Sequence, residues 1–134
     1  MNVLVDTCIW SLALRRTRVA EPKTVAELAA LVQDGRVAMM GAIRQELLSG
    51  VKTAERIELL RDRLRAFPDI DVATEDFERA AAIFNRCRQR GIQGSNTDFL
   101  MCAVAIRHRL AIFTTDDDFE RYARIVAITL HRVG

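Results

Sequence analysis

Five acidic side chains from four separate segments have the chemistry of a site for a hard divalent cation. They are, in chain order, Asp6, Glu46, Asp98, Asp116 and Asp118. Cations such as Mg²⁺ prefer oxygen ligands and usually keep several waters. The two histidines, His108 and His131, stand apart, and we interpret both as ordinary surface groups. The pattern therefore favours a magnesium-type site over a zinc-type site, provided that the fold brings the acids together.

Each acid also has an ordinary structural explanation. Asp6 follows an apolar segment and suits the N-cap of a helix. Asp98 opens the most hydrophobic helix, whose dipole favours an acid in its first turn, although a carboxylate there is costly to desolvate without a partner. Glu46 could be a surface residue, and the three aspartates centred on Asp117 suit a turn. A cation would relieve the repulsion between these acids, so a structural role and a metal-binding role both stay open.

The hydrophobic pattern predicts alternating strands and helices. Strands are expected at residues 2–5, 37–40, 70–72, 110–113 and 125–130. Helices are expected at residues 7–14, 24–35, 41–51, 53–67, 74–91 and 98–106, with a short one before the last strand. This alternation predicts a single α/β domain spanning 1–134, with a parallel sheet covered by helices on both faces. In such sheets the cleft lies at the carboxyl ends of the strands, where Asp6 and Asp116 are expected.

The spacing of apolar residues also predicts which helix faces point inward. The helix from residue 74 is expected to bury Phe77, Ala81, Phe84 and Cys87. The charged helix at residues 53–67 is expected to bury Ile57, Leu60 and Leu64. Thr24, with Glu27 three residues later, has the pattern of a capping box that begins a helix.

Composition excludes several classes of protein. The 134 residues fit one domain with one core. No apolar run is long enough to span a bilayer, and the N-terminus lacks the basic region of a signal peptide, so we expect a cytoplasmic protein with no membrane partner. Cys8, Cys87 and Cys102 are odd in number and form no C-x-x-C pair, which argues against disulfides or zinc. We expect Cys87 and Cys102 to be buried.

Arginine clusters leave nucleic-acid binding open, because the formal net charge is only +2. The clusters are Arg15, Arg16 and Arg18, then Arg86, Arg88 and Arg90, then Arg107, His108 and Arg109. They suit solvated helix surfaces or a phosphate backbone. No glycine-rich nucleotide loop and no G-x-S-x-G turn is present. A phosphatase D-x-D motif fails, because Thr7 and Cys8 follow Asp6.

Four ordered motifs resemble those of the PIN-domain family, and within it the VapC-type toxins of bacterial toxin–antitoxin pairs. They are VLVDTCIW at residues 3–10, IRQELLSG at 43–50, NTDFLMCA at 96–103 and TTDDDF at 114–119. The resemblance covers nearly the whole chain. It implies a twisted parallel sheet with helices on both sides, and hydrolysis of RNA phosphodiesters with Mg²⁺ or Mn²⁺.

The resemblance also assigns roles to the acids. It implies that Asp6, Glu46, Asp98 and Asp116 are the catalytic and metal-binding quartet. It implies that Asp118 is an auxiliary acid and that Asp117 occupies a variable position. Thr7, Thr114 and Thr115 match small hydroxyl positions that could bond to a carboxylate, a water or a phosphate. Cys8 departs from the pattern, because a small polar residue is frequent there.

The same resemblance implies three partners: an RNA substrate, a cognate VapB-type antitoxin that covers the site, and a second copy of the chain in a homodimer. The alternatives are a non-catalytic RNA- or protein-binding module of the same fold and a metal-dependent phosphatase. Metal binding would separate the first alternative from a nuclease, because a binding module need not bind Mg²⁺.

Overall fold

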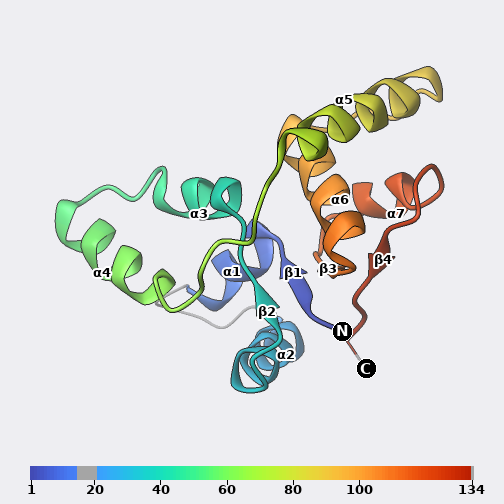
Figure 1. The fold of residues 1–134 in the computed structure, drawn as a ribbon. Helices are drawn as coiled ribbons and strands as arrows, with labels where there is room; N and C mark the ends of the chain where they lie inside the picture. Colours follow the sequence, from blue (N-terminus) through green and yellow to red (C-terminus); the bar gives the residue numbers. More distant parts are fainter. Residues whose placement is uncertain (15–20, 134) are drawn as a thin grey trace.

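A four-stranded parallel sheet organises the fold, in the strand order β2-β1-β3-β4 (Figure 1). The computed structural model describes residues 1–14 and 21–133. The strands are β1 (Val3–Val5), β2 (Val37–Ala38), β3 (Ala111–Phe113) and β4 (Thr129–Leu130). In the register, Val3 pairs with both Val37 and Ala111, and Ile112 pairs with Leu130. The predicted parallel α/β sheet is therefore confirmed.

Burial explains why every residue of β1 and β3 is apolar. All three residues of each strand are buried, as is usual where helices cover both faces of a parallel sheet. Because parallel strands all end at the same edge, the residues after β1 and β3 emerge side by side.

Seven helices surround the sheet within the described residues. They are α1 (Thr7–Ala13), α2 (Pro22–Gln33), α3 (Gly41–Leu48), α4 (Ala54–Leu64), α5 (Thr74–Gln89), α6 (Asn96–His108) and α7 (Asp118–Tyr122). Helix α1 contacts α2 and α3, and α5 packs along α6. In Figure 1, α3 and α4 lie to the left of the strands, nearest to β2, and α5, α6 and α7 lie to the upper right, nearest to β3 and β4. No helix in the described parts of the chain is long and apolar enough to cross a membrane.

Helix α6 is the most buried helix, as predicted. Its residues from Met101 to Ala105 are at most 1% exposed. Cys102 in this helix and Cys87 in α5 are both fully buried, and the three cysteines, all within the described residues, form no disulfide. A helix with so little polar surface is held rigidly by the core, so the residue that opens it is held as well.

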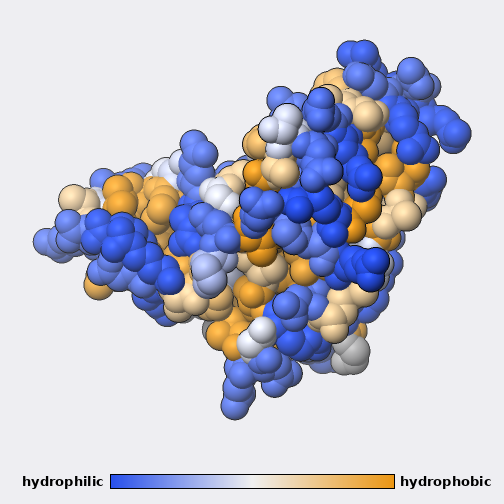
Figure 2. Space-filling model, in the orientation of Figure 1, coloured by the Kyte–Doolittle hydropathy of each residue, from blue (hydrophilic) through white to orange (hydrophobic). Residues whose placement is uncertain are grey.

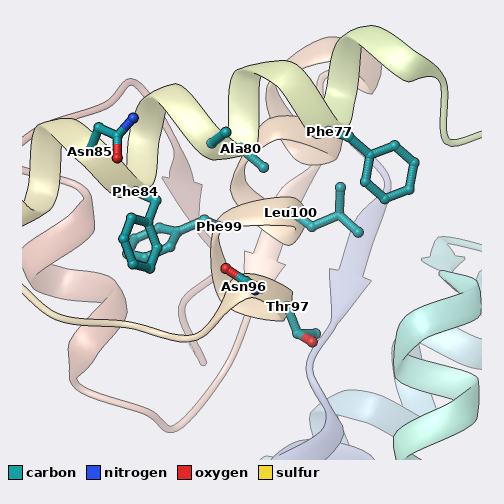
Figure 3. Close-up of a pocket in the computed structure, with 9 residues that line it drawn as sticks. Phe77, Ala80, Phe84, Asn85, Asn96, Thr97, Phe99 and Leu100 are labelled. Atoms are coloured by element: carbon teal, nitrogen blue, oxygen red, sulfur yellow. The ribbon is translucent and has the colours of Figure 1, made fainter.

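The predicted inward face of α5 is wrong except at Cys87, which is buried as expected. Phe77 is 57% exposed and Ala81 is also exposed, whereas Phe84 is half-buried. Phe77 and Phe84 line an open apolar groove between α5 and α6 (Figure 3), and Figure 2 shows hydrophobic residues at the surface in this region. The buried residues are Asp76, Ala80, Ile83 and Cys87. The buried face differs from the predicted one because it includes Asp76, an ion-paired aspartate that apolar spacing cannot indicate.

Two helices begin or pack differently from the prediction. Helix α2 starts at Pro22, because proline suits the first helical turn, so the capping box at Thr24 is wrong. Thr24 instead donates its N–H to the Glu21 carbonyl inside that turn. In α4, Leu64 is buried, but Ile57 is 36% exposed. The helix extends away from the sheet in Figure 1, so its first turns have less core to pack against.

Four smaller predictions are also corrected. Residues 70–72 form no strand, because the pairing there is a single bridge between Met39 and Asp69. Helix α3 ends at Leu48, so Val51 lies beyond it, and β4 is shorter than the predicted strand at 125–130. His131 is no ordinary surface group, because its ring pairs with Glu27 and packs against Phe113.

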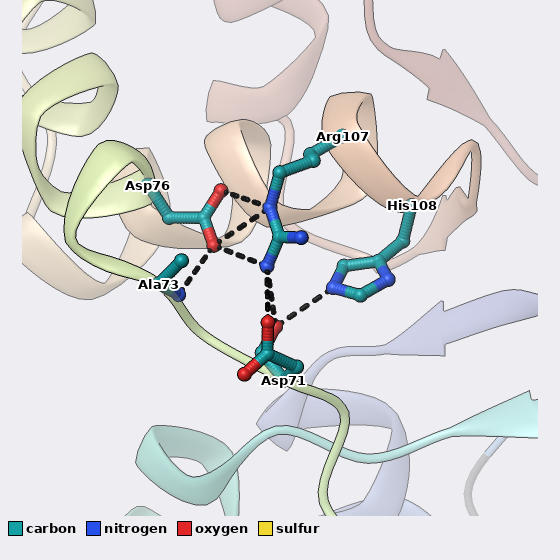
Figure 4. A network of polar contacts seen from close by, with 5 residues as sticks. All are labelled: Asp71, Ala73, Asp76, Arg107 and His108. Carbon is teal, nitrogen blue, oxygen red and sulfur yellow. Dashed lines mark hydrogen bonds and ion pairs between the residues drawn. The ribbon is translucent and has the colours of Figure 1, made fainter.

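An ion pair between a half-buried arginine and a buried aspartate joins the end of α6 to the start of α5 (Figure 4). Arg107 donates to both carboxylate oxygens of Asp76 at 2.7–3.0 Å and to the Asp71 carbonyl at 2.9 Å. Asp76, which is 1% exposed, also accepts the Ala73 N–H at 2.8 Å. His108 bonds to the same Asp71 carbonyl at 2.7 Å. The guanidinium holds the pKa of Asp76 below its ordinary value.

Replacing Asp76 with asparagine is expected to lower the free energy of unfolding by roughly 1–3 kcal/mol at neutral pH. Because the folded pKa lies below the ordinary 3.8, this stability is present above 3.8 and is lost as pH falls through the folded pKa. The difference in the free energy of unfolding between wild type and D76N, measured by urea unfolding, should therefore become smaller in acid. E75Q, at an exposed neighbour, is the control. A difference that stays constant into acid would contradict the assignment.

Candidate functional site

Asp6 stands where β1 ends and α1 begins, and it has two roles at once. Its N–H bonds to the Phe113 carbonyl at the end of β3, which fixes its place at the sheet edge. Its Oδ1 accepts the Thr7 N–H at 2.7 Å, so the N-cap interpretation is confirmed. Its Oδ2 contacts Thr114 and Cys8, and the charge of Glu46 also acts on this carboxylate.

A chain of hydrogen bonds links Asp6 to the loop after β3. Thr114 donates its hydroxyl to Asp6 Oδ2 at 2.8 Å and accepts the Asp116 N–H at 3.0 Å. Asp116 Oδ1 in turn accepts the Asp118 N–H at 2.9 Å. The two strand ends are thus tied together through their own polar residues. Asp118 also pairs with Arg121, and Asp117 is exposed without a side-chain cap bond.

Glu46 joins this cluster from α3. Thr7, in the first turn of α1, donates its hydroxyl to Glu46 Oε1 at 2.7 Å. The contact spans 39 residues of sequence, so it depends on the packing of α1 against α3. Glu46 is exposed, and it is close enough to Asp6 for its charge to act on that carboxylate.

Asp98 reaches the cluster from the first turn of α6. Its N–H bonds to the Oγ of Ser95, the N-cap residue, at 3.1 Å. Its Oδ2 accepts the hydroxyl of Tyr122, in α7, at 2.8 Å. The helix dipole and the N-cap favour the ionised form, but its position beside the core opposes it.

The carboxylates are close enough to influence one another. Burial raises the pKa of Asp6, the charge of Glu46 raises it further, and the bonds from Thr114 and Thr7 act in the opposite direction. Burial also raises the pKa of Asp98, and the charges of Asp6 and Asp116 add to that rise. The structure therefore brings all four predicted quartet members into one electrostatic cluster.

The donor set suits a hard cation, because it consists of carboxylate and hydroxyl oxygens with unfavourable mutual charge. Among residues 1–14 and 21–133, no three acidic, histidine or cysteine side chains are gathered closely enough to hold an ion in their present orientations. Hydroxyls occupy several of the carboxylate oxygens instead. Cation binding by three or more of these groups would therefore need some of the side chains to rotate.

Sequence reasoning missed the roles of Tyr122, Ser95 and Cys8. Cys8 Sγ accepts the Thr115 hydroxyl at 3.3 Å and lies 3.6 Å from Asp6 Oδ2. Thr115 thereby stays near the cluster without touching an acid through its hydroxyl. The serine before the acidic helix start was a detectable N-cap signal. The tyrosine carried no local signal, because its partner lies 24 residues away.

The arginine clusters divide between structure and surface. The cluster at residues 15–18 lies outside the described residues. Arg107 and His108 belong to the buried network at Asp76, which accounts for them without a phosphate. Arg86 donates to the Ile125 carbonyl at 3.0 Å, while Arg88 and Arg90 are exposed.

Comparison with known proteins gives consistent matches along the chain. The family model described as PIN domain matches residues 3–125. Ribonuclease VapC11 of Mycobacterium tuberculosis is 33% identical over 125 residues, which cover 92% of each chain. VapC ribonuclease Mb1587 of Mycobacterium bovis is similar to the same extent.

Solved structures share the fold at lower sequence identity. VapBC2 from Rickettsia felis, solved bound to a DNA fragment from its promoter, matches over 98% of both chains with a TM-score of 0.77 and 20% identity. FitAcB from Neisseria gonorrhoeae covers 97% of this chain and 96% of its own, with a TM-score of 0.72 and 20% identity.

Replacing Thr114 with valine is expected to raise the pKa of Asp6 further, because the lost hydroxyl bond favours the ionised carboxylate. Carbon-13 NMR titration of the aspartate carboxyls measures this directly. T129V, at an exposed threonine of β4, is the matched control and should leave Asp6 unchanged. An Asp6 pKa that is equal in T114V and wild type would show that the hydroxyl does not stabilise the charge.

Proposed function

The chain belongs to the PIN-domain family, and on that premise we propose that it is a Mg²⁺- or Mn²⁺-dependent endoribonuclease that acts as the toxin of a VapBC-type toxin–antitoxin pair. One observation carries the proposal. Four carboxylates from four distant segments lie near the carboxyl edge of the parallel sheet. Hydrogen bonds through Thr7 and Thr114 link Asp6 with Glu46 and Asp116, and the charges of Asp6 and Asp116 act on Asp98. Such an arrangement is costly without a cation, because burial and mutual repulsion both oppose ionisation.

We assign Asp6 and Asp98 as the central metal ligands, since both are fixed by helix caps at the edge of the core. Glu46 and Asp116 complete the site, either directly or through waters, and Asp118 supports Asp116 through its N–H. A bound cation would supply a water of lowered pKa and neutralise charge on the phosphate being cleaved.

The hydroxyl residues orient this acidic quartet. Thr114 holds one oxygen of Asp6, and Thr7 holds one oxygen of Glu46, which limits the rotations that cation binding would need. Preorganised oxygen ligands need less rearrangement to bind a cation than mobile ones. Thr115 bonds to Cys8, and its exposed position would let it meet a phosphate of the RNA.

The antitoxin is assigned to a groove between α1, α3 and α4. Apolar residues including Leu47 and Leu60 line it, and Leu59 is 60% exposed. Three cations also line it: Lys52, Arg56 and Arg63. An apolar floor with positive charges suits an acidic amphipathic segment. The relatives of known structure include toxin–antitoxin complexes, which supports this choice of partner.

The homodimer is assigned to the other apolar groove, between α5 and α6 (Figure 3). Its described lining carries no charged side chain, and it includes Phe77, Phe84 and Leu100. A neutral apolar surface can face its own copy without repulsion, whereas the basic groove cannot. Asn96 and Thr97 line the same groove, so a second copy would sit next to Asp98.

Purified protein should cleave RNA with Mg²⁺ or Mn²⁺ and lose the activity on chelation. D6N and D98N should each lower the rate by about 100-fold or more, because each removes a central ligand. D117N makes the same charge change at an exposed residue of the same acidic run and should stay near wild type. Cleavage that survives chelation or both ligand substitutions would refute the proposal. RNA binding without cation binding would favour the non-catalytic module instead.

F77D should convert the dimer into a monomer in analytical ultracentrifugation, because it places a charge in the apolar α5–α6 groove. Phe77 is largely exposed in one chain, so folding should be unaffected. L59D is the matched control, since Leu59 is equally exposed but lies in the basic groove. A wild-type chain that sediments as a monomer, or an F77D dimer, would contradict this assignment.

A further inference from the structure

The buried hydroxyl of Tyr122 makes an unusual contact for a core residue. Tyr122 is 0% exposed, yet its hydroxyl reaches the edge of the core and donates to Asp98 Oδ2 at 2.8 Å. The same hydroxyl lies 3.5 Å from the Gln93 carbonyl, in the loop before α6. It thus connects α7, which begins at Asp118 shortly after Asp116, with the helix that carries Asp98.

Aromatic packing fixes the position of this hydroxyl. The Tyr122 ring lies 4.9 Å from the Phe99 ring and 5.1 Å from the Phe119 ring, and both phenylalanines are buried. Phe99 also meets Phe84 edge to face at 5.5 Å. Contacts of this kind, in a densely packed core, leave a ring little freedom to move. The oxygen at its tip is therefore held in one place.

The loop before α6 is shaped around the same oxygen. A Cβ added at Gly94 would overlap the Tyr122 hydroxyl and the tip of the Phe99 ring. Gly94 has no positive φ, so the need for glycine here is a matter of space and not of backbone conformation. Gly94 and Tyr122 therefore depend on each other, because the absence of a side chain at Gly94 leaves room for the Tyr122 hydroxyl.

We propose that Tyr122 is a positioning residue, whose hydroxyl fixes the orientation of the Asp98 carboxylate for cation binding. The proposal rests on the metal-dependent function proposed above. A carboxylate has two oxygens. Because the Tyr122 hydroxyl holds Asp98 Oδ2, it determines the direction in which Asp98 Oδ1 faces a bound cation. Mutation of a residue that hydrogen-bonds to a metal ligand commonly lowers metal affinity by about 10–100-fold.

A purely structural role is the competing explanation, because a buried tyrosine hydroxyl usually needs a partner. The two roles differ in their consequences. A structural hydroxyl would affect stability alone, whereas a positioning hydroxyl would affect Asp98 itself, with or without a cation. The decisive readouts are therefore the side-chain order of Asp98 and the affinity for Mn²⁺.

Y122F keeps the ring and removes the hydroxyl, so it should fold. In the metal-free chain, NMR relaxation should show lower side-chain order at Asp98, with Asp6 unchanged. Calorimetric titration should show Mn²⁺ affinity weakened by about 10-fold or more. T53A is the matched control, because it removes a hydroxyl that accepts the Arg56 N–H at 3.3 Å in the first turn of α4. T53A should lower the melting temperature and leave Mn²⁺ binding intact.

G94A offers a second route to the same result, because it displaces the hydroxyl without removing it. It should reproduce the loss of Asp98 order and of Mn²⁺ affinity seen in Y122F. Y122F with wild-type Asp98 order and Mn²⁺ affinity would overturn the proposal, whatever its melting temperature. If the wild-type chain binds no Mn²⁺, the proposed function fails, but Asp98 order in Y122F still decides whether Tyr122 positions it.

Discussion

The repulsion between carboxylates crowded at one sheet edge is the constraint on which the rest of this structure depends. Asp6 and Asp98 lie beside the core, where burial and neighbouring charges oppose ionisation. The fold offsets that cost with directed hydrogen bonds from Thr114 and Tyr122 and with helix N-termini. A divalent cation would offset the part of that cost that the protein donors leave, and the proposal of a metal site rests on this.

Structural and chemical roles coincide at this edge instead of competing. Asp6 caps α1 and belongs to the acidic quartet, so the interpretations that the sequence left open are both compatible with its position. The rigidity comes from further away. The core of α6 holds Asp98, and the ion pair between Arg107 and Asp76 fixes that helix to α5. Because these supports lie outside the acidic cluster, they can set its geometry without adding charge to it.

The sheet and the acids could be predicted from sequence because their signals are local. An apolar strand followed by an acid, as at Asp6 and Asp116, needs only the rule that parallel strands end at one edge. The face of α5 could not be predicted, because the partner of Asp76 is 31 residues away. Tyr122 was missed for the same reason, since its contact with Asp98 depends on how α7 packs. Local pattern located the acids, and tertiary packing supplied what orients them.

The central claim is that four carboxylates from four segments form one cation site. The most direct test is a crystal structure of the wild-type chain grown with Mn²⁺, with anomalous scattering used to locate the ion. We predict an anomalous peak bonded to oxygens of Asp6 and Asp98, with Glu46 and Asp116 bonded directly or through waters. An ordered Mn²⁺ elsewhere on the chain, or none at saturating concentration, would contradict the account.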